Sequence, residues 1–281
     1  MYGSLLKMAA SGLLTAGLVT AAYLFYTVRR NAWLLRAVEA FDECRQDVRE
    51  ALLIGLHRLF DRPSSEWTPV LARDGITVAT SFSACGLTGG RGVRTYRALS
   101  FLSQNEISVD RMLALLDGGF LNEEVWFKKD FKGGRRVEEL DPPPGQPAQS
   151  AQTAWIASYV SDVKPLKLRE FVYLLCRRAL EPAEFSRCDP CPGRKIMRQA
   201  CIAYRSVRRP GTHSAYVRAI QYPSLDRITL YDDGTIGWEH IMAFHIAGVI
   251  PLWLNNLLVR AAAKVLYEEA ANMRKHRHGE S

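Results

Sequence analysis

The chain has 281 residues, of which 48% are hydrophobic and 23% are charged, a composition typical of a globular protein with a sizeable core. The mean hydropathy of -0.11 excludes a polytopic membrane protein. The formal net charge is +8, but the basic residues are scattered among acidic ones, so the sequence gives no support for a nucleic-acid partner. Six cysteines are too few for a disulfide framework.

The first segment of the chain is a candidate membrane anchor. No charged residue occurs from Met8 to Val28, and a helix of this length spans about 31 Å, enough to cross a hydrocarbon core. A cleaved signal peptide, with Lys7 as its basic region, is the alternative, but the apolar run continues into aromatic residues before Arg29 and Arg30. We therefore expect residues 1–30 to be a single-pass anchor that leaves the body of the protein in the cytosol. The endoplasmic reticulum and the mitochondrial outer membrane both fit.

The next segment has the pattern of an amphipathic helix. Apolar residues recur at helical spacing from Ala32 to Phe60, acidic residues occupy the other faces, and Pro63 ends the pattern. We expect residues 31–51 to be a linker helix and residues 52–275 to be one domain, followed by a polar tail at 276–281. Gly12 and Ala16 would let two anchors pack closely, so a homodimer through the anchor or the linker helix is an open alternative.

The body of the chain alternates short strand-like runs with turn residues. Strands are predicted at residues 67–71, 76–82, 93–102, 137–140, 154–163, 171–180, 198–207, 214–222 and 236–245. The turns include Asp74-Gly75 and Asp232-Asp233-Gly234. A short helix is predicted from Ile107 to Leu116, with Ser108 as its cap. After Pro251 the pattern becomes helical for about 24 residues.

Several motifs resemble catalytic or metal-binding patterns but lack residues that those patterns require. The glycines from Gly86 to Gly92 lack the Lys-Ser/Thr of a phosphate-binding loop, and the Cys188/Cys191 pair has no second pair at metal-binding spacing. His240 and His245 lie five apart on a predicted strand and should point to opposite faces. We therefore predict no catalytic residue, no metal site and no cofactor.

Five motifs in this order resemble the START lipid-transfer family over about residues 52–275. They are Trp67 with Asp74-Gly75-Ile76-Thr77-Val78, Trp126, the segment from Val163 to Val172 containing Arg169-Glu170-Phe171, Tyr216-Val217-Arg218-Ala219, and the segment from Gly248 to Asn256. The resemblance implies an α+β helix-grip fold, in which a curved antiparallel sheet wraps a long carboxy-terminal helix, preceded here by the transmembrane helix. It also implies a hydrophobic cavity that holds one lipid.

The implied cavity would be closed by the last helix. Its expected lining is Leu254, Leu257, Leu258 and Ala261 on that helix, with Trp238, Met242 and Phe244 on the preceding strand. An apolar stripe of this kind is more often sealed core than ligand pocket. Arg169 and Arg218 are candidates for a headgroup contact, with a surface or structural ion pair to Glu170 or another acid as the alternative.

The expected function is therefore lipid binding or lipid transfer at a membrane. An anchored lipid sensor or adaptor that recruits a protein partner is the main alternative, and an enzyme acting on a hydrophobic small molecule is a minor one. Sterol, phosphatidylcholine, ceramide and fatty acid all satisfy an apolar lining, so the sequence does not select the lipid.

Overall fold

The computed structural model describes most of the body of the chain. The described residues are 22, 49, 52–53, 64–81, 94–116, 131–140, 153–162, 166–180, 182, 191, 193–207, 215–246, 250, 254–255, 257 and 260–275. Except for Ala22, the predicted anchor lies outside them, as do Cys188, Leu258 and the side chain of Ala261. Within the described residues no helix is both long enough and apolar enough to span a membrane.

Strands dominate the described chain. They are β1 (Thr68–Arg73), β2 (Ile76–Ser81), β3 (Thr95–Ser103), β4 (Phe131–Leu140), β5 (Thr153–Ser161), β6 (Arg169–Leu180), β7 (Ile196–Ser206), β8 (Val217–Arg218), β9 (Ile220–Gln221), β10 (Ser224–Tyr231), β11 (Thr235–Met242) and β12 (Phe244–His245). The helices are η2 (Ser64–Glu66), α3 (Val109–Leu116) and α5 (Arg260–Lys275). Leu254, Asn255 and Leu257, just before α5, are helical as well.

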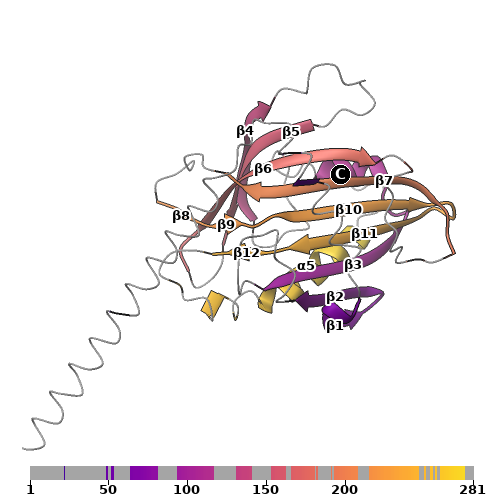
Figure 1. The fold of residues 1–281 in the computed structure, drawn as a ribbon, viewed down its shortest axis with the longest axis horizontal. Coiled ribbons are helices and arrows are strands. Elements are labelled where there is room, and N and C mark those ends of the chain that lie inside the picture. Colours follow the sequence, from indigo (N-terminus) through magenta and orange to yellow (C-terminus); the bar gives the residue numbers. More distant parts are fainter. Residues whose placement is uncertain are drawn as a thin grey trace, which may run out of the picture.

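One large antiparallel sheet organises the fold. Its strand order is β1-β2-β3-β11-β10-β7-β6-β5-β4, with the short β8 added in parallel to β6. The sheet is twisted, with β1 and β4 at opposite edges (Figure 1). β9 and β12 pair with each other and form a separate two-stranded sheet. β10 and β11 come late in the sequence, yet they lie in the middle of the sheet. β11 pairs with β3 on one side, and β10 pairs with β7 on the other.

Two tight turns follow directly from their residues. Asp74 and Gly75 both have positive φ, at 52° and 69°, as the two central residues of a hairpin turn between β1 and β2 require. Between β10 and β11, Gly234 has a φ of 77° and its N–H donates to the Tyr231 carbonyl at 3.1 Å. Both turns confirm the sequence prediction.

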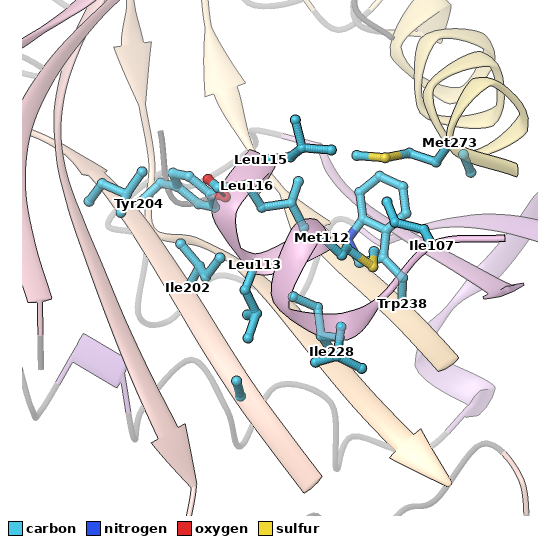
Figure 2. Close-up of a cluster of buried hydrophobic side chains, with 14 of the residues drawn as sticks. Ile107, Met112, Leu113, Leu115, Leu116, Ile202, Tyr204, Ile228, Trp238 and Met273 are labelled. Atoms are coloured by element: carbon cyan, nitrogen blue, oxygen red, sulfur yellow. Dashed lines mark hydrogen bonds between the residues drawn. The ribbon is translucent and has the colours of Figure 1, made fainter. Parts of the chain in front are cut away.

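The two longer helices cover the same face of the sheet, which we call the inner face. The predicted cap of α3 is confirmed, since the Arg111 N–H donates to Ser108 Oγ at 3.1 Å. Side chains of α3, including Met112 and Leu113, point toward the strands, and Met273 of α5 joins the same buried cluster (Figure 2). α5 packs mainly on β2 and β3.

The other face of the sheet, which we call the outer face, has its own buried cluster. It includes Leu52, Leu53 and Trp67 from before the sheet, and Val172 and Leu174 from β6. Central strands are therefore buried on both faces, which explains why β6 reads as a nearly continuous apolar run.

The structure corrects the predicted strands in four places. β10 was not predicted at all, because Asp226 and Arg227 interrupt its apolar pattern. β4 begins at Phe131, before the predicted start at Val137. The predicted strand 214–222 contains only the two-residue strands β8 and β9. The predicted strand 236–245 is divided at Ala243, because β11 pairs with β3 and β10 whereas β12 pairs with β9.

Candidate functional site

The predicted apolar residues on β11 and β12 lie on the inner face. Trp238 is buried in the same cluster as α3, whereas Met242 and Phe244 remain partly exposed and pack against Val78, Tyr96 and Ala98 with residues of α5. The structure therefore brings Met242 and Phe244 to the region that α5 crosses. Trp238 lies deeper, beside α3 (Figure 2).

The predicted residues before α5 are less enclosed. Leu254 is partly buried, and Leu257 is 50% exposed. The neighbouring Asn255 is fully buried, and its side chain accepts from the Ile246 N–H at 3.0 Å. This hydrogen bond ties the start of the closing helical region to the end of β12.

The two predicted arginines lie in different settings. Arg169 is buried and donates to the carbonyls of Ile246 at 2.7 Å and Lys167 at 2.6 Å. Arg218 donates to two backbone carbonyls, those of Val172 at 3.0 Å and Val207 at 2.9 Å. Backbone carbonyls hold both guanidinium groups, so each has a structural role in this conformation.

Glu170 lies next to Arg218 in the register of β6 and β8. Burial lowers the pKa of Arg218 to about 10, and the charge of Glu170 opposes this shift. Glu170 itself accepts a hydrogen bond from Ser158 Oγ at 2.7 Å. Glu170 is therefore close enough for its charge to act on the Arg218 guanidinium.

A polar cluster that the sequence analysis missed lies on the inner face. Asp226 on β10 stands directly opposite His240 on β11, and Asp226 Oδ1 is 2.6 Å from His240 Nδ1. Trp238 Nε1 donates to the same carboxylate oxygen at 2.7 Å, and Tyr204 Oη donates to Oδ2 at 2.5 Å. Tyr204 Oη also lies 3.1 Å from the Leu116 carbonyl oxygen, which places this inner-face cluster beside the end of α3.

The environment of Asp226 favours its ionised form. Burial by itself raises the pKa of a carboxyl group, but the charge of His240 and the hydrogen bonds from His240, Tyr204 and Trp238 lower the pKa of Asp226 overall. Tyr173 lies near enough for this carboxylate to add to the rise that burial causes in the tyrosine pKa. Asp226 is therefore a carboxylate enclosed by donors.

A second charged cluster lies behind the first, on the outer face. Arg227 stands opposite Glu239 in the register, and Arg227 Nε donates to Glu239 Oε2 at 2.6 Å. Arg97 Nη2 donates to the other carboxylate oxygen at 2.6 Å, and its guanidinium lies 5.8 Å from the centre of the Trp67 ring. The Arg227 and Glu239 side chains are 0% and 2% exposed. We call Arg97, Arg227 and Glu239 the outer-face ion cluster.

The signal for both clusters was present in the sequence. Alternate residues of a strand point to opposite faces, so Asp226-Arg227 and Glu239-His240 each place one polar group on either side of the sheet. The missing step was the recognition of β10 as a strand. In the described part of the chain no three His, Cys, Asp or Glu side chains are grouped as a metal site would require.

The described thiols differ in burial. Burial raises the pKa of Cys176 and that of Cys201 to about 12, whereas Cys191 is partly exposed. At pH 8 we expect iodoacetamide to label Cys191 in the native full chain at least about a hundredfold faster than Cys176 or Cys201, because the thiolate is the reacting species. Peptide mass spectrometry after timed labelling measures the three rates.

The same labelling in concentrated urea is the control, and there the three rates should converge. Native labelling of Cys176 or Cys201 at the rate of Cys191 would contradict the buried positions of these thiols.

Comparison with known proteins supports the fold and not a closer relationship. No family model and no curated protein matches the sequence. Among solved structures, human StAR-related lipid transfer protein 5 matches with a TM-score of 0.55 and 13% identity over 81% of this chain and 93% of that one. Human STARD10 gives 0.52 and 15% over 76% of both chains. The lipid transfer and protein localization domain of human StarD13 gives 0.51 and 19% over 76% of this chain and 90% of that one.

Proposed function

Given that this chain has a START-like domain, we propose that it is a membrane-anchored lipid-binding protein that holds one lipid between the inner face of its sheet and the closing helix. The observation that carries the proposal is the inner face beside α5. There Met242, Phe244 and Tyr267 are apolar or aromatic but only partly buried, next to a sealed core. Two of the similar structures are lipid transfer proteins by name, which supports the same function.

The physical basis of the proposal is the burial of lipid tails. Each methylene removed from water contributes about 0.8 kcal/mol, so an acyl chain or a sterol ring system binds tightly to an apolar wall. Release then requires the region around α5 to move, which a membrane surface would favour by offering an apolar medium. The proposed lining keeps Leu254, Leu257, Leu258 and Ala261 in the closing helical region.

The remaining parts of the proposal concern location. Residues 1–30 would anchor the protein in a membrane, residues 31–51 would act as an arm, and residues 52–275 would carry the lipid in the cytosol. The proposed role is binding or transfer without chemical change of the lipid.

The test is native mass spectrometry of the full chain purified from a eukaryotic host, followed by lipid extraction. We expect one lipid per chain in the wild type. Met242→Asp should lower the occupancy at least about tenfold, because a carboxylate is costly in an apolar wall. The matched control is Met197→Asp, since Met197 is 55% exposed on β7 and its replacement should leave the occupancy unchanged.

The outcomes separate the alternatives. A folded wild-type chain that carries no lipid would overturn lipid binding and favour the adaptor. An extracted molecule that differs chemically from the lipid supplied would favour an enzyme. Accelerated movement of lipid between donor and acceptor vesicles would distinguish transfer from sensing.

A further inference from the structure

One polar atom of the inner-face cluster, His240 Nε2, takes no part in the hydrogen bonds of the cluster. His240 uses Nδ1 toward Asp226, and in the described part of the chain the structure gives Nε2 no partner. The His240 side chain is 14% exposed, compared with 2% for Asp226. His240 therefore lies at the boundary between the buried cluster and the less enclosed part of the inner face.

Asp226 fixes which nitrogen of His240 is available. A carboxylate accepts but does not donate, so the proton of the neutral imidazole belongs on Nδ1 and Nε2 carries the lone pair. Trp238 and Tyr204 hold the same carboxylate at 2.7 Å and 2.5 Å, which keeps Asp226 in position independently of His240. The ring is thus oriented by a second set of hydrogen bonds.

Apolar side chains of β3 and α5 lie near His240 on the inner face. His240 stands opposite Ala98 on β3, whose side chain is a single methyl group. Ala98 belongs to a buried cluster with Ala263 and Leu266 of α5, and Met242 packs against that cluster. A small number of polar groups beside an apolar wall can orient a mostly apolar ligand.

The charge of the cluster selects among polar groups. An anionic phosphate or carboxylate at Nε2 would approach the Asp226 carboxylate, which repels it. A hydroxyl both donates and accepts, so it pairs with Nε2 in either protonation state and carries no charge. The cluster therefore favours a neutral hydroxyl over an anion.

We propose that His240 is the group that recognises the polar end of the bound lipid, and that this end is the hydroxyl of a neutral lipid alcohol. The inference rests on the proposed lipid-binding function and names the ligand class for it. Asp226, Trp238 and Tyr204 act as positioning residues. Arg169 and Arg218, which the sequence suggested for this role, remain with their backbone carbonyls.

The test is a competition experiment with the full chain. Phosphatidylcholine vesicles containing trace cholesterol, dioleoylglycerol and C16-ceramide, each with its O-methylated counterpart, and also phosphatidic acid and oleic acid, are incubated with the protein. The lipids bound after re-isolation are extracted and quantified by mass spectrometry. We expect at least one alcohol to be enriched about five- to thirtyfold over its methyl ether, the ratio expected for one hydrogen bond to a buried group.

Two variants test whether His240 causes the preference for an alcohol over its methyl ether. His240→Phe keeps an aromatic ring but removes the acceptor, so the alcohol-to-ether ratio should fall to near one. His240→Gln keeps an acceptor and a donor of similar reach and should restore part of the ratio. A ratio unchanged in His240→Phe would overturn the proposal.

The wild-type result decides the proposal even if a variant does not fold. Equal recovery of each alcohol and its ether, or a preference for phosphatidic acid or oleic acid, overturns the role of His240 but leaves lipid binding standing. A wild-type chain that recovers no lipid overturns both.

Discussion

Glu239→Gln is expected to lower the free energy of unfolding by about 3–5 kcal/mol, because it removes the charge of the carboxylate to which both arginines of the outer-face ion cluster donate. Arg227 is fully buried and Arg97 is 18% exposed, so Arg227 in particular cannot turn to water when Glu239 loses its charge. Urea denaturation of the full chain, followed by circular dichroism, measures the change.

The control for this prediction is Glu139→Gln on the edge strand β4, where the side chain is exposed. It removes the same charge and should change stability by no more than about 0.5 kcal/mol. The double variant Arg227→Met with Glu239→Leu should recover more than half of the loss, because it replaces the buried charges by an apolar pair, and Arg97 is near enough to the surface to be solvated. A loss below about 1 kcal/mol in Glu239→Gln would show that the cluster is solvated.

Leu113→Ala is expected to cost about 2–5 kcal/mol, because it opens a cavity where α3 meets the sheet. Leu113 is 0% exposed and lies in the cluster formed with Ile202 and Ile228 (Figure 2). α3 has only eight residues, so packing and not intrinsic helix stability holds it in place. The same urea experiment measures the cost.

Met197→Ala provides the comparison, since it deletes a side chain of similar size that is 55% exposed. Its effect should stay within about 0.5 kcal/mol. Similar losses for the two variants would mean that α3 does not pack on the inner face as described.

Local signals predicted much of the fold. Asp74-Gly75, Asp232-Asp233-Gly234 and Ser108 each impose a backbone conformation or a hydrogen bond on their neighbours, and the structure shows all three. The length of β4 was not predictable in this way. Gly133 and Gly134 are weak strand formers, and pairing with β5 overrides that preference.

The candidate site was only partly predictable, for a different physical reason. The apolar pattern of the predicted strand 236–245 led to Trp238, Met242 and Phe244 as the cavity lining that the resemblance implies, and the structure places them on the inner face. The apolar pattern could not identify Asp226 or His240. A polar residue in a strand predicts an exposed position unless the partners of its hydrogen bonds are known. Those partners come from β7 and β11, and only the sheet order brings them to β10.

The position of β10 and β11 in the sheet also sets an order of events during synthesis. β1–β3 and β4–β7 form two groups that share no strand pairing within the described sheet until β10 and β11 join them. A nascent chain that ends at Pro223 therefore presents two open strand edges, on β3 and on β7. When the hairpin arrives, a slip of one residue would set Asp226 against Glu239 or Ile241, so the opposite charges admit one register.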